Sequence, residues 1–347
     1  MGAGPAAAYF IREGLLRSRS AQFDVFEKSA GLLGRLKTGV APDQSAIRKT
    51  IPGLEEVFAD KRVKLHTETG RGPPLRVKDL QSEYDAVVLA TGGAPRKLDI
   101  PGAQHVVSAD KMMESISNRR PVAAKGKIAV IGSGNVAMDA ARMLLHSKHM
   151  RKYTSALEGV CVDRVDIIGR SPPESSKFTN SVLAEVLKYP TTVQVSKNAE
   201  SWMSSARAQG SKAARRRASL LARADSSKKI LQFVFEETPV RVEKVCSGGE
   251  KNKSALGRPE ASAPEEKFRL TTETKDGQRT TREYDGVVAA LGYVPHDHAD
   301  MLEGVSAPVL RIGWAKSGAQ GTLSDAYATA LEAADTIFAQ ERAAGLE

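Results

Sequence analysis

Two glycine-rich turns constrain the fold of this 347-residue chain more than any other feature. The second turn, Gly132-x-Gly134-x-x-Ala137, follows an apolar run at 127–131 and leads into a helical pattern that ends near Leu145. In such a strand–turn–helix unit, the first glycine permits a tight turn, the second lets a pyrophosphate approach the backbone, and the small third residue lets helix and strand pack closely. The phosphates then meet the positive end of the helix dipole. The pattern predicts a dinucleotide site here, with a plain glycine-rich turn as the alternative.

The next predicted strand, 165–168, indicates which dinucleotide this turn would bind. It ends in Gly169-Arg170 rather than in an acidic residue. An acid at this place bonds the ribose 2′-hydroxyl of NAD, whereas an arginine accommodates the 2′-phosphate of NADP. NADP is therefore the predicted ligand, and a merely solvated loop arginine is the alternative. The predicted NADP contacts come from Gly132, Gly134, Asn135, Val136 and Arg170.

The first turn, Gly2-x-Gly4-Pro-x-Ala7, has a complementary signature. Glu27 follows it at the end of a short predicted strand, near the spacing of about 20 residues expected for an acid that binds an adenosine ribose. This arrangement suits FAD. No strand precedes the glycines, although that strand is central to the sheet in a Rossmann order. We therefore expect either that the natural chain begins upstream of Met1 or that this site is damaged.

Alternating strand and helix patterns along the chain predict a doubly wound α/β architecture with two Rossmann-like dinucleotide-binding domains. The length suits two domains. A helix is predicted over 47–60 and a strand over 233–245. A hairpin is predicted at Asp276-Gly277, and the Gly-, Ser-, Pro- and Lys-rich span 247–265 predicts a flexible excursion.

The composition excludes several classes of protein. Hydrophobic residues make up 41% and charged residues 27%, as in ordinary globular chains, and no apolar run approaches the length of a membrane span. We expect a soluble protein without membrane insertion, and no targeting leader is visible. The two cysteines, Cys161 and Cys246, give neither zinc spacing nor a C-x-x-C dithiol. No metal site is predicted, and redox chemistry would need a bound cofactor.

The net charge of +10 is concentrated in one stretch. Residues 207–229, the basic segment, hold eight basic side chains against a single acid, Asp225. Such a patch predicts docking of an acidic partner. A solvated helix face is about as good an interpretation, and nucleic acid ranks third because no aromatic residues interleave with the basic ones.

Four stretches resemble those of one family, the adrenodoxin reductase type of NADPH-ferredoxin reductases, from Gly2 to about Thr329. The segment Gly34-Arg-Leu-Lys-Thr-Gly39-Val40-Ala41-Pro42-Asp43 resembles GLVR-x-GVAPDH, and 132–145 resembles G-x-GNVALD-x-AR-x-LL. Residues 165–170 are similar to the approach to VGRRGP, and 313–318 to GW-x-KRGPTG.

This resemblance implies an FAD-binding domain built from both chain ends, residues 1–105 and 306–347, with an NADP-binding domain at 106–305 inserted between them. In such enzymes NADPH reduces the flavin, and the flavin passes electrons to a small acidic iron–sulfur ferredoxin. The implied catalytic residues are Asp139 and Lys316. The FAD contacts expected from the first turn and from the resemblance are Gly2, Gly4, Pro5, Ala6, Glu27, Lys28, Gly34, Val40, Thr91, Gly92, Trp314 and Gly321.

The resemblance also implies a role for the basic segment and a compartment. Arg215, Arg216 and Arg217 resemble the family's basic stretch R-x-R-K-R-L-x-x-LL, in which ferredoxin-docking arginines lie. Family members in eukaryotes are mitochondrial, so a mitochondrial (matrix) location is expected.

Several motif positions depart from the family pattern. The histidine of GVAPDH is Gln44, the second arginine of VGRRGP is Ser171, and Arg35 stands where the family has leucine. The motif KRGPTG reads KSGAQG at 316–321, and the C-terminal region of typical members is missing. These departures suggest relaxed selection for catalysis.

Two hypotheses therefore stand side by side. The first is an active NADPH-dependent flavoprotein reductase of a ferredoxin. The second is a catalytically inactive homologue that serves as a structural or assembly subunit of a large mitochondrial complex, with protein or RNA partners on the basic segment. A different oxidoreductase with two dinucleotide folds is a weaker third option, and a dithiol reductase is excluded by the cysteine pattern.

Overall fold

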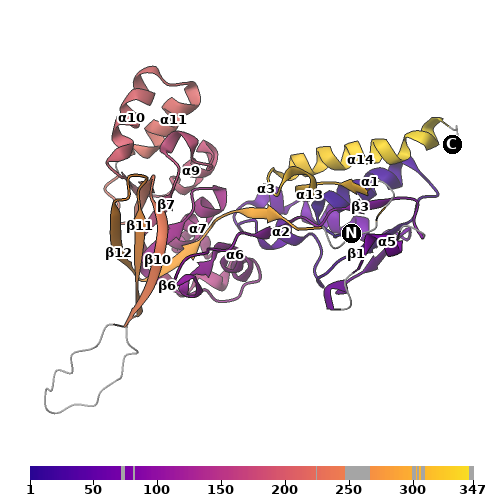
Figure 1. Cartoon of the computed structure of the whole chain (residues 1–347), viewed down its shortest axis with the longest axis horizontal. Coiled ribbons are helices and arrows are strands. Elements are labelled where there is room, and N and C mark those ends of the chain that lie inside the picture. The colour runs from indigo at the N-terminus through magenta and orange to yellow at the C-terminus, as the bar shows by residue number, and fades with distance from the viewer. Residues whose placement is uncertain are drawn as a thin grey trace, which may run out of the picture. The chain divides into compact units, whose positions relative to one another are not determined.

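The computed structural model of the chain describes residues 1–71, 75–80, 83–223, 225–246, 266–298, 302, 305 and 309–343. It divides into two compact units (Figure 1): unit 1 comprises Met1–Arg96 and Tyr293–Glu347, and unit 2 comprises Lys97–Gly292. The sequence places the corresponding boundaries after residues 105 and 305. The predicted excursion at 247–265 lies outside the described residues.

Unit 2 is built on a six-stranded sheet in which every neighbouring pair of strands is parallel. In spatial order the strands are β5 (Val107–Ser108), β13 (Gly286–Ala289), β6 (Ala124–Ile131), β7 (Val160–Gly169), β9 (Ile230–Phe235) and β8 (Thr192–Val195). The helices of this unit are α6 (Ala109–Ser117), α7 (Asn135–Leu145), α8 (Ser147–Met150), α9 (Asn180–Val186), α10 (Asn198–Gln209) and α11 (Lys212–Leu221). This order of alternating elements confirms the predicted α/β class.

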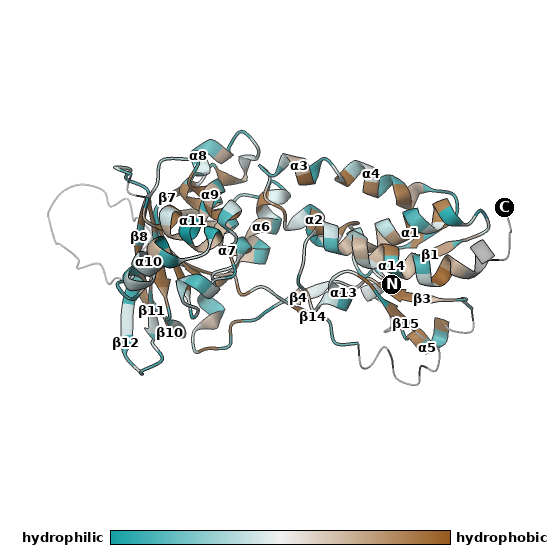
Figure 2. Cartoon of the chain, turned by 90° about the horizontal axis from the view of Figure 1, so that it is seen from above, coloured by the Kyte–Doolittle hydropathy of each residue, from teal (hydrophilic) through white to brown (hydrophobic). Residues whose placement is uncertain are grey.

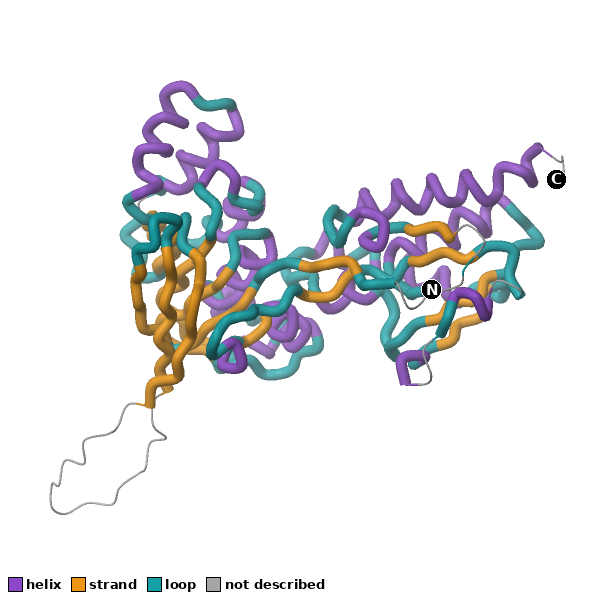
Figure 3. Tube along the Cα trace, viewed as in Figure 1, coloured by secondary structure: helices purple, strands orange, loops and turns teal. Residues whose placement is uncertain are grey.

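The central strands of unit 2 form because their apolar runs can be buried on both faces of the sheet. Residues 128–131 of β6 and 165–169 of β7 are all buried, and α7 packs its buried residues Ala137, Ala141 and Leu144 on the same side of the fold. In Figure 3 the strands of unit 2 are drawn in orange, with purple helices beside them.

A three-stranded antiparallel sheet completes unit 2. It contains β10 (Thr238–Cys246), β11 (Glu266–Glu273) and β12 (Arg279–Tyr284), and the hairpin between β11 and β12 lies at the predicted Asp276-Gly277 pair. The sequence predicts one strand over 233–245, and this is wrong in one respect. A turn at Glu236, whose φ is +60°, separates β9 from β10.

The strands of unit 1 are short and form three two-stranded ladders. β1 (Phe23–Phe26) pairs in parallel with β2 (Val63–His66), β3 (Val87–Leu89) pairs in parallel with β15 (Val309–Arg311), and β4 (Gly93–Pro95) pairs antiparallel with β14 (Tyr293–Pro295). The helices are α1 (Pro5–Arg17), α2 (Gly34–Thr38), α3 (Ser45–Arg48), α4 (Ile51–Glu55), α5 (Val77–Leu80), α13 (Trp314–Ser317) and α14 (Leu323–Ala343).

The two ends of the chain share one hydrophobic core in unit 1. Helices α1 and α14 lie side by side (Figures 1 and 2), and Phe10 and Ile11 of α1 are buried with Ala334 and Phe338 of α14. The aromatic rings of Phe10, Phe23 and Phe338 lie 6.1–6.5 Å apart, in edge-on and tilted arrangements. This core fixes the first glycine-rich turn relative to the strands.

One predicted helix of unit 1, over 47–60, is broken in the structure. It divides into α3, α4 and a 3₁₀ turn at Glu56–Ala59. Pro52 lacks a backbone N–H and is tolerated only in the first turn of a helix, so a new helix begins at Ile51 with Pro52 in its first turn.

Candidate dinucleotide-binding sites

The glycine turn of unit 2 is held between three parallel strands. Gly132, with φ +118°, donates its N–H to Ile168 O of β7 at 2.8 Å, and Ala290 N, directly after β13, donates to Ile131 O at 2.7 Å. A Cβ at Gly132 would lie 2.2 Å from Ala290 O. Both the backbone conformation and the close carbonyl therefore require glycine at this position.

Gly134 stands at the N-cap of α7, where the chain enters the helix. Nothing lies within 4 Å of the Cβ that a larger residue would have there, so the space above this backbone is open. The first backbone N–H groups of a helix have no partner within the helix and carry partial positive charge. The turn therefore has the open, electropositive backbone that a pyrophosphate needs.

The other residues predicted to contact NADP surround this turn. Arg170 is exposed at the end of β7, and Val136 is half-buried. Asn135 uses its side-chain Oδ1 to accept a hydrogen bond from Thr179 N at 2.9 Å. Asn135 thus ties the start of α7 to the loop that follows Arg170.

Asp139, one of the two predicted catalytic residues, lies in the second turn of α7. Its carboxylate pairs with Arg142 Nη2 at 2.8 Å, and the Arg142 side chain is only 1% exposed. The buried guanidinium fixes the orientation of a partly accessible carboxylate. The catalytic role of Asp139 stays a prediction.

The glycine turn of unit 1 repeats this construction. Gly2 has φ +93°, and a Cβ there would lie 2.5 Å from Ala90 O, the carbonyl directly after β3. Gly4 is the N-cap of α1, and Pro5 occupies the first turn, where its missing N–H costs nothing. Ala6 is buried, and a Cβ on Gly313 would lie 2.7 Å from its methyl group, so only small residues fit this contact.

Glu27 closes the unit 1 turn. Its Oε2 accepts a hydrogen bond from Ala3 N at 2.8 Å, and its Oε1 accepts from Ser29 N at 2.9 Å and from Ser29 Oγ at 2.7 Å. The carboxylate is thereby fixed at the end of β1, next to the turn. A carboxylate oxygen can accept more than one hydrogen bond, so these contacts are compatible with an additional ribose hydroxyl.

A cavity of about 390 Å³ opens beside this turn, and it brings together four of the predicted FAD residues: Gly2, Glu27, Lys28 and Thr91. Its wall also contains two histidines that the sequence analysis missed. His298 Nε2 lies 2.6 Å from Thr91 Oγ1, and burial lowers the pKa of His296 and of His298. The run Pro295-His-Asp-His directly after a strand was the available signal.

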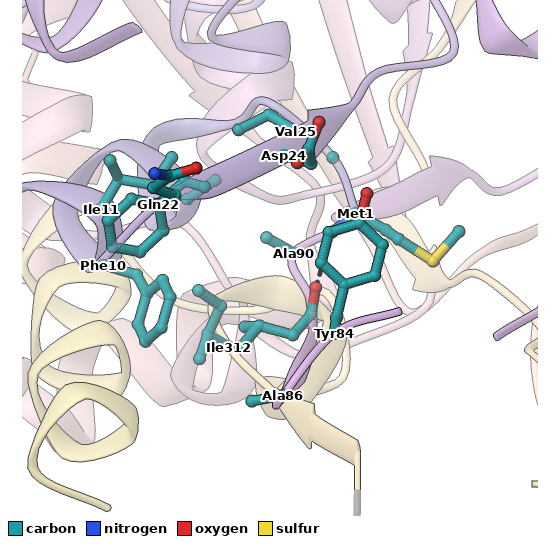
Figure 4. Close-up of a pocket in the computed structure, with 14 residues that line it drawn as sticks. Met1, Phe10, Ile11, Gln22, Asp24, Val25, Tyr84, Ala86, Ala90 and Ile312 are labelled. Atoms are coloured by element: carbon teal, nitrogen blue, oxygen red, sulfur yellow. Dashed lines mark hydrogen bonds between the residues drawn. The ribbon is translucent and has the colours of Figure 1, made fainter. Parts of the chain in front are cut away.

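A smaller hollow of about 100 Å³ lies between β1 and β3 (Figure 4). Val25 of β1 lies on one side and Ala86, next to β3, on the other, with Phe10 and Ile312 beneath. Met1 enters this hollow as a strand would, since its ammonium group donates to Val88 O at 2.7 Å and its carbonyl accepts from Ala90 N at 2.8 Å.

The remaining predicted FAD residues are distributed over unit 1. Trp314 Nε1 donates to Gly321 O at 3.1 Å, and its ring packs on Tyr293 at 4.9 Å between centroids. Lys316, the second predicted catalytic residue, forms an ion pair with Glu332 of α14 at 2.6 Å. Three other positions lie in loops or short elements: Gly34 begins α2, Val40 is half-buried, and Gly92 has φ +71°.

Arg35, the charged departure from the family pattern, does not point into empty space. Its guanidinium carbon lies 5.5 Å from the centroid of the Tyr293 ring, which in turn contacts Trp314. The structure accommodates this charge by a cation–π contact.

The three predicted docking arginines on α11 differ in their surroundings. Arg215 and Arg216 are exposed, as are Arg207 and Lys212. Arg217 is half-buried and bonds to backbone carbonyls of 173–178. Some side chains of the basic segment thus carry their charge at the surface, whereas Arg217 is used in contacts within the unit.

Among the described residues, no helix is both long and apolar enough to cross a membrane. Over the same part of the chain, His, Cys, Asp and Glu side chains form no cluster of three that could hold a metal ion.

Comparison with known proteins gives matches that include parts of both units. Residues 44–215 match the pyridine nucleotide-disulphide oxidoreductase family. The chain is 31% identical over 206 residues to the mitochondrial NADPH:adrenodoxin oxidoreductase of Drosophila melanogaster, a match that covers 55% of this chain and 44% of that protein. It is 25% identical to the probable NADPH:adrenodoxin oxidoreductase of Schizosaccharomyces pombe, over 97% of this chain and 80% of that protein. The match to the first of these relatives thus spans less than half of its length.

A solved structure extends the similarity to the whole fold. FprA from Mycobacterium tuberculosis, in complex with NADPH, superposes with a TM-score of 0.75 at 21% identity, covering 99% of this chain and 84% of that one.

The fold and its two glycine turns define a protein with two Rossmann-like dinucleotide-binding folds. Within that class, the chain is similar to mitochondrial NADPH:adrenodoxin oxidoreductases, the resemblance that its motifs predict. The alternative of a non-catalytic assembly subunit finds no support among these relatives.

Proposed function

We propose that this chain is an NADPH-dependent flavoprotein that passes electrons from NADPH through FAD to a small iron–sulfur protein. The observation that carries the proposal is a pair of equivalent glycine turns whose neighbouring charged residues have opposite signs, Glu27 in unit 1 and Arg170 in unit 2. In unit 1 the carboxylate of Glu27 lines the same cavity as Gly2, which would suit an adenosine ribose. In unit 2 Arg170 directly follows Gly169, which faces Ser133 of the turn, and this would suit a 2′-phosphate.

The residues present fit these two ligands. The cavity beside Gly2 and Glu27 would hold the adenosine end of FAD, with Lys28 and Thr91 on its wall. The backbone at Gly134 would receive the pyrophosphate of NADP, because no other atom of the chain fills the space within 4 Å of the position that a Cβ would take there. When bound, the flavin supplies the conversion of a two-electron hydride transfer into single-electron steps.

The chain's own residues would bind the two cofactors and orient their reacting rings. Arg170 would pair with the 2′-phosphate, and the N-terminus of α7 would hold the pyrophosphate by backbone N–H groups. Asp139, held by Arg142, and Lys316 are the proposed charged residues at the reacting rings. The Trp314–Tyr293 pair would present an apolar surface to a flavin.

The proposed electron acceptor is an acidic ferredoxin of the adrenodoxin type. The exposed residues Arg207, Lys212, Arg215 and Arg216 give α10 and α11 a positive surface that would steer such a partner. The relatives from Drosophila and fission yeast are named as mitochondrial, so we propose the mitochondrial matrix as the compartment.

An absorption spectrum of the purified protein, reconstituted with FAD, tests this proposal. We expect a flavin band that bleaches on addition of NADPH and much more slowly with NADH, since Arg170 favours the 2′-phosphate. The variant Arg170→Ala should remove most of that preference, while Lys148→Ala, an exposed charge on α8, should leave it unchanged. A protein that stays colourless after reconstitution would contradict the proposal.

A further inference from the structure

Arg217 donates hydrogen bonds to four backbone carbonyls, and it would have to break them to reach a docked partner. Its Nη1 donates to Pro173 O at 2.9 Å, to Glu174 O at 3.2 Å and to Ser176 O at 3.3 Å, and its Nη2 donates to Phe178 O at 2.8 Å. The guanidinium carbon also lies 4.8 Å from the Phe178 ring centroid. A single side chain of α11 thereby binds most of the 173–178 loop.

Asn180, at the start of α9, adds to the contact between Arg217 and the 173–178 loop. Its Oδ1 accepts from Arg217 Nε at 3.1 Å, and its Nδ2 donates to Ala213 O at 2.9 Å. The loop and the start of α11 are therefore joined by side chains from both.

The loop in turn is bonded to the glycine turn of unit 2. Phe178 N donates to Ser133 O at 3.0 Å, and Thr179 N donates to Asn135 Oδ1 at 2.9 Å. Ser133 also packs against Gly169, where a Cβ would lie 2.9 Å from its Oγ. A continuous set of contacts thus runs from Arg217 through the loop to both sides of the turn, next to Arg170.

We infer that Arg217 is a positioning residue for the dinucleotide turn: it holds the 173–178 loop against Ser133 and Asn135 and so fixes the surroundings of Arg170. The inference rests on the proposed binding of NADP in unit 2. It separates Arg217 from Arg215 and Arg216, which remain the docking residues.

Three variants of α11 test this assignment. In Arg217→Ala, hydrogen exchange of the amides at 174–179 should accelerate at least about tenfold, because the carbonyls lose their shared donor. The KM for NADPH should rise about tenfold with little change in kcat, which is the signature of lost binding rather than lost chemistry. The double variant Arg215→Ala/Arg216→Ala should raise the KM for ferredoxin and leave both readouts unchanged.

Arg217→Lys and Asn180→Ala provide graded controls in case the alanine variant folds poorly. Lysine keeps the charge but lacks the planar fork, so it should restore only part of the protection and of the NADPH affinity. Asn180→Ala should give a smaller effect in the same direction.

Two results would overturn the inference: unchanged exchange of the amides at 174–179 in Arg217→Ala, or faster exchange there with the NADPH affinity intact. The exchange measurement needs no cofactor. A wild-type chain that binds no NADP would therefore contradict the proposed function, while the contact of Arg217 with the loop would still be decided separately.

Discussion

The two glycine turns are alike in geometry but differ in what precedes them. Gly2 and Gly132 both have positive φ, and each abuts the carbonyl that directly follows a neighbouring strand, at Ala90 and Ala290. In unit 2 the turn follows the eight-residue strand β6, which pairs with β13 on one side and β7 on the other. In unit 1 only Met1 occupies the equivalent place.

This difference shows that the sequence around such a turn has two separate roles: it forms the turn, and it continues the sheet. The turn itself is specified by the glycines and by the helix that follows, because both units form it. The continuity of the sheet depends on the strand before it, and unit 1 accordingly has short two-stranded ladders with a hollow between β1 and β3.

The largest expected effect is the difference in the free energy of unfolding when alanine replaces the first glycine of each turn. Gly132→Ala should lower the free energy of unfolding by about 3 kcal/mol or more, because the methyl group meets a backbone carbonyl between fixed strands. Gly2→Ala should cost less, about 1–2 kcal/mol, since the ladders beside it in unit 1 have two strands each and can shift more easily than a six-stranded sheet. Denaturant unfolding of both variants measures the difference.

Gly134→Ala is the matched control, since its Cβ would meet no atom within 4 Å. It should unfold nearly as the wild type does. If Gly132→Ala is equally mild, the strands around the turn are less rigid than the structure indicates.

Acid should weaken the two units over different pH ranges. Burial lowers the pKa of the Met1 ammonium group from 8.0 to about 6, and burial together with His149 and Lys229 lowers that of His146 in unit 2 from 6.5 to about 4. The unfolded chain binds the extra proton in each interval, so stability falls as the pH drops, by up to about 3 kcal/mol for each group. Unit 1 should weaken between pH 8 and 6, and unit 2 between pH 6.5 and 4.

Hydrogen exchange, followed separately in each unit, measures this order. His146→Gln should flatten the lower transition, and acetylation of the N-terminus the upper one. Simultaneous loss of protection in both units at one pH would contradict the assignment.

A smaller effect, about 2 kcal/mol, is expected from filling the hollow of unit 1. A variant with four additional apolar, β-branched residues before Met1 should form a parallel strand between β1 and β3, gaining buried area and ladder hydrogen bonds. Its thermal midpoint should rise relative to a variant with a Gly-Ser-Gly-Pro extension. Equal midpoints would show that the hollow does not accept a strand.

The local parts of the fold and of the sites could be predicted from the sequence. The turns at Gly2 and Gly132 and the hairpin at Asp276-Gly277 follow from short patterns in which each residue has a specific backbone role. The break in the predicted helix at Pro52 was also within reach, because proline is tolerated only in the first turn of a helix.

Contacts between distant segments could not be predicted in the same way. The carbonyls that bind Arg217 come from a loop about 40 positions earlier in the chain, and nothing in the charge pattern of α11 distinguishes Arg217 from Arg216. The Thr91–His298 contact joins positions 207 residues apart. Such pairings are set by the packing of the whole unit.

The contacts of Arg217 also bear on the order in which unit 2 folds. Four carbonyl dipoles of the 173–178 loop converge on one point, and their partial negative charges repel each other unless a cation lies between them. The chain supplies that cation from α11. The carbonyls of the loop beside Arg170 therefore all have their donor only when the helix carrying the basic segment has docked against the loop.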